Sequence, residues 1–132
     1  MIGIDTNVLV RFFANDDAKQ SPSARRLIDN KLSAAEPGHI SLVVLAELAW
    51  VLTARYRLRA SEISDALAIL LAEARFVVQD RAAAWAALDL YRGGKVDFAD
   101  ALIAAVDRLH FARFTVTFDK KAARATGMTL LE

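Results

Sequence analysis

Short apolar runs alternate with helical segments along the chain, and this alternation constrains the fold more than any other feature of the sequence. Runs with strand character cover residues 2–4, 39–41, 76–79 and 114–118, and residues 128–131 form a last edge strand. Short, largely continuous apolar runs are typical of strands that are covered on both faces of a parallel sheet. The sequence therefore predicts an open α/β fold with helices on both sides of a parallel sheet.

Helices are predicted between these runs, over residues 22–32, 42–58, 62–74, 81–92, 97–112 and 119–125. Ser21, Ser41, Ser61 and Asp80 precede four of these helices. Their side-chain oxygens are expected to accept hydrogen bonds from the free backbone N–H groups of the first turn. In open parallel sheets, ligands bind beyond the carboxyl ends of the strands. The residues that follow the strands are therefore the first candidates for a functional site.

Composition favours a folded domain and excludes several kinds of site. The 132-residue chain is 55% hydrophobic and 25% charged, which is typical of a globular protein, and we expect one domain over residues 1–132. The absence of cysteine excludes disulfides, thiolate metal sites and a cysteine nucleophile. The formal net charge of +1 neither favours nor excludes nucleic acid as a partner. With no signal-peptide pattern and no apolar run that spans a bilayer, we expect a soluble cytoplasmic protein.

Two acidic residues directly follow predicted strands. Asp5 comes after the run at residues 2–4, and Asp119 after the run at residues 114–118, with Thr117 just before it. Aspartate is also a favoured helix N-cap, which explains each position equally well. Taken alone, either acid leaves both capping and chemistry open.

Glu47 is the most informative acid, because it lies in a helical stretch that is otherwise apolar. Between Leu42 and Leu52 every other residue is apolar, and the residues three and four positions away from Glu47 provide no cation to pair with it. A helix that is apolar all round is expected to be buried, and an ionised carboxylate there needs a partner. Glu47 therefore predicts a distant salt bridge, a hydrogen-bond network or a cleft that holds water.

Asp97 and Asp100 are three residues apart and share one face of a predicted helix. Acids favour the first turn of a helix, which accounts well for Asp97. It accounts less well for Asp100, because the apolar residues that follow turn this side chain towards the core. Two like charges at this spacing repel each other unless a positive group lies near them.

If the sheet is parallel, Asp5, Glu47, Asp100 and Asp119 can meet at one edge of it. Four close carboxylates cannot all ionise without a compensating charge, and a divalent cation provides one. Hard oxygen ligands favour Mg²⁺ or Mn²⁺, whereas two histidines and no cysteine give little support for zinc. Such ions, held by carboxylates, serve phosphoryl transfer and phosphodiester hydrolysis.

Four segments of the chain resemble the PIN-domain ribonucleases, and within them the VapC-like toxins of bacterial and archaeal toxin–antitoxin pairs. The segments are IGIDTNVLV at residues 2–10, SLVVLAELAWVL at 41–52, DFADALIAA at 97–105 and TVTFDKKA at 115–122. Together they cover essentially the whole chain. The resemblance implies a three-layer α/β/α sandwich with a central, mostly parallel sheet of four or five short strands.

The resemblance also assigns roles to individual residues. The family's four catalytic, metal-binding acids match Asp5, Glu47, Asp100 and Asp119, and Asp97 falls on a position that is often acidic. Small polar residues that support these acids match Thr6, Asn7 and Thr117. The implied activity is cleavage of RNA, such as tRNA or rRNA, with one or two Mg²⁺ or Mn²⁺ ions. The implied partners are a second copy of the chain and an antitoxin that covers the active-site groove.

Binding of RNA requires cations for its phosphates. The candidates near the predicted active edge are Arg11, Lys95, Lys120 and Lys121. The densest basic stretch, at residues 55–59, is better explained as a solvated helix end whose cations complement the helix dipole. The helices that carry Trp50 and Leu67–Leu71 have more apolar surface than a small sheet needs, which is compatible with a dimer or antitoxin interface.

Two other functions stay open at this point. A phosphatase or phosphotransferase with Asp5 as nucleophile would use the same architecture, but it needs a second aspartate two residues later, where this chain has Asn7. Such an enzyme also needs a lysine at the end of a later strand, and Lys120 keeps this possibility open. A non-catalytic RNA- or protein-binding PIN domain would carry the acids as structural residues. Metal-dependent degradation of RNA separates the nuclease from both.

Overall fold

Strands and helices alternate in the computed structural model, which describes all of residues 1–132. The strands are β1 (Ile2–Gly3), β2 (Gly38–Ile40), β3 (Phe76–Val78), β4 (Val116–Thr117) and β5 (Thr129–Leu130). The α-helices are α1 (Thr6–Ala14), α2 (Gln20–Arg26), α3 (Leu42–Ala54), α4 (Ala60–Ala72), α5 (Arg81–Arg92), α6 (Phe98–Leu109) and α7 (Lys120–Thr126). One π-helical turn, η1 (Leu27–Lys31), continues α2.

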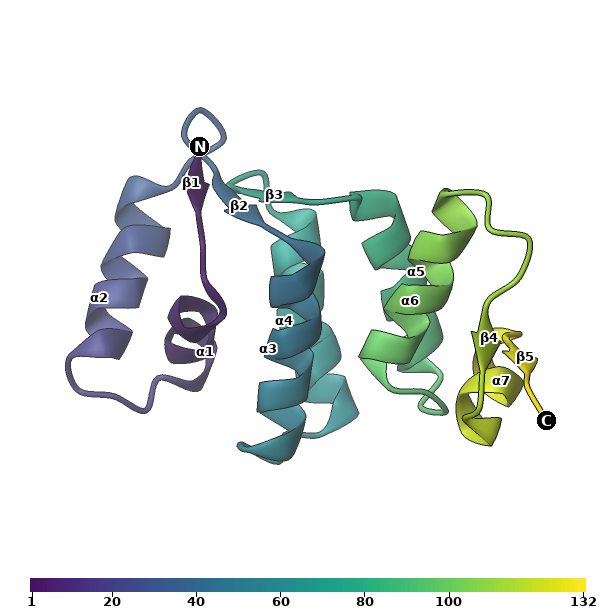
Figure 1. Cartoon of the computed structure of the whole chain (residues 1–132). Helices are drawn as coiled ribbons and strands as arrows, with labels where there is room; N and C mark the ends of the chain where they lie inside the picture. Colours follow the sequence, from purple (N-terminus) through teal and green to yellow (C-terminus); the bar gives the residue numbers. More distant parts are fainter.

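The strands form two sheets, and every pairing in them is parallel. The first sheet has the order β1-β2-β3, and the second consists of β4 and β5. The predicted α/β class with parallel strands is therefore confirmed. The strands do not share one central sheet, however, because β4 bonds only to β5. Figure 1 shows α5 and α6 between the three-stranded sheet and the two-stranded one.

The first sheet is held together by close packing at its middle strand. Gly38 of β2 pairs with Ile2 on one side and Phe76 on the other. A Cβ atom on Gly38 would lie 2.9 Å from Leu32 Cδ1 and 3.0 Å from Ile4 Cγ1. Glycine is therefore favoured here by the close approach of its neighbours, which would have to shift to make room for a side chain.

The predicted helix caps are only partly correct. Ser41 caps α3 as predicted, because its Oγ accepts a hydrogen bond from the backbone N–H of Val44. The predictions for Ser21 and Ser61 are wrong by two residues, because α2 follows Lys19 and α4 follows Arg59, and nearby carboxylates satisfy the first N–H groups instead. Asp17 accepts from two backbone N–H groups at the start of α2, and Glu62 accepts from the backbone N–H that precedes α4. Asp80 precedes α5, but its side chain makes no capping hydrogen bond.

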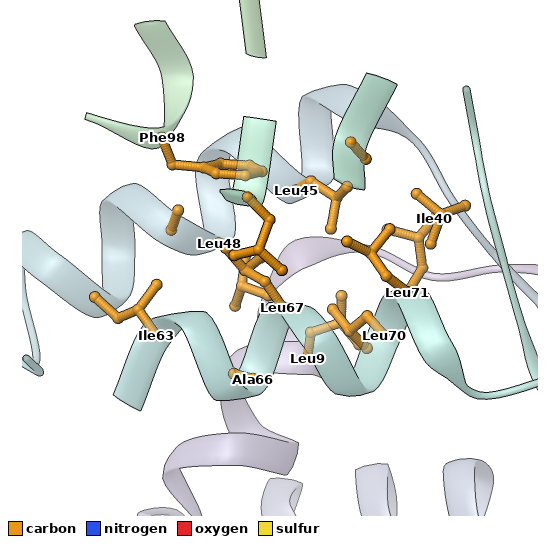
Figure 2. Close-up of a cluster of buried hydrophobic side chains, with 14 of the residues drawn as sticks. Leu9, Ile40, Leu45, Leu48, Ile63, Ala66, Leu67, Leu70, Leu71 and Phe98 are labelled. Carbon is orange, nitrogen blue, oxygen red and sulfur yellow. The ribbon is translucent and has the colours of Figure 1, made fainter. Parts of the chain in front are cut away.

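The main core lies between α3 and α4 and is closed by residues of other elements. Leu45 and Leu48 of α3 pack with the leucines of α4, while Leu9 of α1 and Phe98 of α6 complete the cluster (Figure 2). Leu67, Leu70 and Leu71 are at most 1% exposed. These α4 leucines are therefore used within the chain, and the expectation that they contribute to an interface is wrong.

A second, much smaller cluster holds the C-terminal part of the chain. Ala104 of α6, Ala122 of α7 and Met128 form it, and α7 packs on α6. The apolar side chains of Phe111, Phe114 and Phe118 near β4 are exposed. None of the helices combines the length and the apolar character that crossing a membrane requires.

Candidate functional site

Asp5 lies at the junction between β1 and α1. Its Oδ1 accepts a hydrogen bond from the backbone N–H of Thr6 at 2.8 Å, so Asp5 caps α1, and its side chain remains exposed. Because β1, β2 and β3 run parallel, Asp5 lies at the same edge of the sheet as Ser41, which follows β2, and Gln79, which follows β3. Asp5 is therefore both a helix cap and an accessible carboxylate at the carboxyl edge of the sheet.

Glu47 lies on the exposed face of α3 and not in a buried environment. Its neighbours on that face, Val43 and Trp50, are 77% and 59% exposed. The prediction that α3 is buried on all sides is wrong, because the core covers only the face that carries Leu45 and Leu48. Glu47 forms no ion pair. Of the three environments predicted for its carboxylate, contact with solvent in a cleft is the one that the structure supports.

One pocket of about 320 Å³ is lined by both Asp5 and Glu47. Thr6 and Asn7, to which the resemblance assigns support of these acids, contribute to the same wall. The buried hydroxyl of Thr6 is unusual, because it is a buried side-chain oxygen that has no hydrogen-bond partner in the chain. The pocket therefore offers two carboxylates and an amide, all of which are oxygen donors to a hard cation. We refer to it as the N-terminal acidic pocket.

Arg11 forms part of the wall of this pocket and is held there by a polar network. Its Nη1 donates to Asp16 Oδ1 at 2.9 Å and to the Tyr56 hydroxyl at 3.2 Å, and its Nε donates to Gln20 Oε1 at 2.7 Å. The Tyr56 hydroxyl in turn donates to Asp16 Oδ2 at 2.8 Å. The hydrogen bond from Tyr56, followed by that from Arg11, holds the pKa of Asp16 below its ordinary value. The sequence did not indicate this network, because Tyr56 is 40 residues away from Asp16.

Asp97 and Asp100 line a second pocket, of about 330 Å³, together with Tyr91 and Trp50. Asp100 is half-buried at the first turn of α6, in agreement with its predicted orientation towards the core. Burial raises the pKa of Asp100, the charges of Asp97 and Asp119 raise it further, and Lys121 opposes them. Burial also raises the pKa of Tyr91, a residue of this pocket for which no local sequence pattern predicts a role. We refer to this cavity as the C-terminal acidic pocket.

Asp119 lies between β4 and α7, where it makes hydrogen bonds with Thr117 and with the first turn of α7. Its Oδ1 accepts a hydrogen bond from the backbone N–H of Ala122 at 3.0 Å, so it caps α7. Its own backbone N–H donates to the Thr117 hydroxyl at 3.0 Å. Lys120 and Lys121 follow it with exposed side chains. Lys95, also exposed, lies in the turn before α6.

The structure thus divides the predicted acids into two groups. Asp5 and Glu47 share the N-terminal acidic pocket, whereas Asp97 and Asp100 share the C-terminal one, close enough to Asp119 for its charge to act on Asp100. Trp50 lines both pockets. No three histidine, cysteine, aspartate or glutamate side chains are close enough together to form one metal centre.

The donors of each pocket nevertheless fit a hard divalent cation in their chemistry. Mg²⁺ is commonly held by only one or two protein carboxylates, with water and substrate phosphate completing its shell. Asp5 with Glu47, and Asp97 with Asp100, each meet that requirement in number and type.

Parallel strands with covering helices, and carboxylates that follow the strands, define an α/β protein with two pockets that each contain a pair of carboxylates. The sequence model of the PIN domain matches residues 2–128, and the chain belongs to this family. PIN domains are in general nucleases that depend on divalent metal ions, which supports a nuclease function for this chain. No curated protein matches the sequence significantly.

Proposed function

We propose that this protein is a metal-dependent endoribonuclease that hydrolyses phosphodiester bonds of RNA and acts as the toxin of a toxin–antitoxin pair. The observation that carries the proposal is the N-terminal acidic pocket, where Asp5 and Glu47 lie together in a chain that belongs to the PIN family. A tRNA or an rRNA is the substrate we propose. The resemblance of the four sequence segments to VapC-like toxins supports the toxin role.

The proposed ligands of one or two Mg²⁺ or Mn²⁺ ions are the carboxylates of Asp5, Glu47, Asp100 and Asp119, with Asp97 as an additional acid. When bound, such an ion supplies an activated water and positive charge for the developing oxyanion. The division of the acids between two pockets supports a centre in which few carboxylates bind each ion and water completes the shell.

The remaining residues of the pocket have roles that need no ion. Capping of α1 fixes the Asp5 side chain through its Oδ1 and leaves Oδ2 for other contacts. Arg11, oriented by Asp16 and Tyr56, provides N–H donors for a phosphate at the pocket wall. Asn7 provides an amide beside them, and Thr117 fixes the backbone of Asp119. Lys95, Lys120 and Lys121 are proposed as weaker phosphate contacts near the C-terminal acids.

The proposed partners follow from the toxin role. Val43 and Trp50 form an exposed apolar strip on α3 beside Glu47, which supports coverage of this face by an antitoxin or by a second copy of the chain. A homodimer that acts in the cytoplasm is the proposed assembly. Both partners would screen the acidic pockets from substrate or shape the approach to them.

The test is degradation of RNA by the purified protein with Mg²⁺ or Mn²⁺, with and without EDTA. We expect cleavage of a total tRNA and rRNA preparation that stops when EDTA is added. The matched variants are Asp5→Asn, which removes a proposed ligand, and Asp65→Asn, which changes an exposed acid of α4 outside both pockets. Cleavage that persists in EDTA or in Asp5→Asn would contradict the proposal, and so would formation of an aspartyl-phosphate on Asp5.

A further inference from the structure

We infer that the groove between α1 and α2 binds the phosphates of the RNA strand that reaches the N-terminal acidic pocket. This inference rests on the proposed nuclease function and specifies the route of its substrate. The groove has a volume of about 690 Å³, compared with about 320 Å³ for the acidic pocket. The helices α1 and α2 that form it pack against each other at one end of the molecule (Figure 1).

The charge of the groove points to an anionic ligand. Its walls carry Arg11, Arg26 and Lys31, and no carboxylate lines it. Arg11 is paired with Asp16, whereas Arg26 and Lys31 form no ion pair and are exposed. Two uncompensated cations therefore face the same groove. Phosphate groups are the anions that such cations bind in nucleic acids, with release of counterions.

The π-helical turn η1 explains why Arg26 and Lys31 face the same groove. In an α-helix, residues five positions apart point about 140° away from each other. In η1 the backbone N–H of Leu32 bonds to the carbonyl oxygen of Leu27, five residues earlier, at 3.0 Å. This wider turn brings residues five positions apart onto one face. The turn thus places the two cations together, and π-helical turns are frequent at functional sites.

Arg25, the residue before Arg26 in α2, has a structural role. The Arg25 guanidinium donates from Nη2 to the carbonyl oxygen of Phe12 at 3.3 Å and lies 5.4 Å from the centre of the Phe12 ring. Arg25 therefore fastens α2 to α1 and does not line the groove. Arg26 makes no such contact, so packing does not account for its position.

The groove and the acidic pocket lie next to each other. Asn7 and Arg11 line both of them. They are four residues apart in α1 and therefore share one face of that helix. A phosphodiester chain that lies against Arg26 and Lys31 can continue past Arg11 to Asp5 and Glu47. The groove thus leads a bound strand to the carboxylates.

The lining favours RNA over an acidic protein segment as the occupant. Only three of the nine lining residues are apolar, whereas a helical peptide needs a row of apolar anchor sites. Gln20 and Ser23 add an amide and a hydroxyl to the wall, and such groups commonly donate to phosphate and sugar oxygens. The pattern is that of a site that contacts a nucleic-acid backbone and does not read its sequence.

The experiment measures RNA binding separately from cleavage. A fluorescently labelled oligouridine is titrated with the full chain carrying Asp5→Asn, in EDTA, at a series of salt concentrations, and the anisotropy is recorded. The test variant adds Arg26→Ala and Lys31→Ala. The charge-matched control adds Arg113→Ala and Arg124→Ala, two exposed cations near β4 and in α7, far from α1 and α2 in Figure 1. A third variant, Arg26→Lys with Lys31→Arg, keeps the charge.

Loss of two phosphate contacts is expected to reduce the slope of log affinity against log salt by about 1.4, since each single-strand contact contributes about 0.7. Affinity at low salt is expected to fall on the order of 10-fold, with binding unchanged in the control and retained in the charge-keeping variant. All variants are expected to keep the circular dichroism spectrum of the parent chain, because both side chains are exposed.

Two results would overturn the inference. One is an unchanged slope and affinity in the test variant. The other is unchanged RNA binding together with lost binding of a poly-glutamate peptide, which would assign the groove to an acidic protein partner. Failure of the proposed function has a different signature, because the groove variant would then lose binding while the unmodified chain cleaves no RNA with Mg²⁺ or Mn²⁺.

Discussion

The two groups of predicted acids differ in how firmly the rest of the chain supports them. The N-terminal pocket lies at the edge of a three-stranded sheet, beside the main core, and its Arg11 is held by three polar side chains. Asp97 and Asp100 also lie beside the main core, because Ala49, Tyr91 and Phe98 of that core line their pocket. Asp119, in contrast, lies beside a two-stranded sheet and a cluster of three buried residues. The first pocket is therefore built into the core of the fold, whereas Asp119 depends on a small peripheral unit.

Carboxyl groups in or near the two pockets have their pKa values shifted in opposite directions. Near the N-terminal pocket, a carboxylate is paired with a guanidinium and a phenol, which lowers the pKa of Asp16. In the C-terminal pocket, burial and two neighbouring carboxylates raise the pKa of Asp100, and Lys121 opposes them only in part. Uncompensated negative charge is what a cation relieves. The N-terminal pocket therefore contains a fixed cation of the protein, Arg11, whereas the C-terminal pocket has too little positive charge to balance its carboxylates.

Removal of one carboxylate from each pocket tests whether both serve one reaction, and it has the largest expected effect. Asp5→Asn and Asp100→Asn are each expected to lower the rate of metal-dependent RNA cleavage by more than about 100-fold, because even residues that only orient metal ligands are worth about 10- to 100-fold. Asparagine retains the capping geometry of Asp5, so the fold is expected to persist. The measurement is the single-turnover rate at saturating Mg²⁺.

Asp65→Asn is the control for both variants, since Asp65 is exposed on α4 and lines neither pocket. We expect its rate to equal that of the unmodified chain. A full rate in Asp100→Asn combined with loss in Asp5→Asn would restrict the active site to the N-terminal pocket. The reverse result would move it to the C-terminal one.

Core substitutions test the difference in structural support. Leu48→Ala, in the main core, is expected to lower the free energy of unfolding by about 2–5 kcal/mol. Met128→Ala, in the small cluster and 9% exposed, is expected to cost about 2 kcal/mol or less, because the site lies near the surface and can collapse. Urea unfolding measures both values. Equal losses in the free energy of unfolding would show that the small C-terminal cluster contributes as much to stability as the main core.

Hydrogen exchange provides the local measure for the same comparison. Amide groups of β4 and β5 are expected to exchange through openings of lower free energy than those of α3 and α4, since each of these strands has two residues and little buried surface around it. The opposite order of protection would contradict the stability difference. Exchange in Met128→Ala is expected to accelerate in the C-terminal unit alone.

The order of the elements and the parallel pairing could be predicted from sequence, because apolar runs and helical periodicity are local patterns. The caps Asp5 and Asp119 and the orientation of Asp100 were accessible for the same reason. The exposure of Glu47 was not, because a helix with apolar residues all round gives no indication of which face the core covers. Tyr56, Arg26 and Lys31 were also missed, since the contacts of Tyr56 are made across 40 residues and the register of the two cations depends on a π-helical turn.

Acidification tests the polar network of the N-terminal pocket and has the smallest expected effect. The pKa of Asp16 lies below its ordinary value of 3.8, because it accepts hydrogen bonds from Tyr56 and Arg11. A carboxyl with a lowered pKa in the folded state stabilises the fold above its unfolded pKa, and this contribution is lost as the pH falls through the folded pKa. We expect Asp16→Asn to be less stable than the unmodified chain at pH 7, and the difference to shrink below pH 3.8.

The urea midpoint as a function of pH measures this difference, and exposure of the side chains keeps it small. Asp65→Asn is again the matched control, with a midpoint expected to follow that of the unmodified chain at every pH. A difference in midpoint that stays constant with pH would show that the Asp16 carboxylate contributes nothing to the network through its charge.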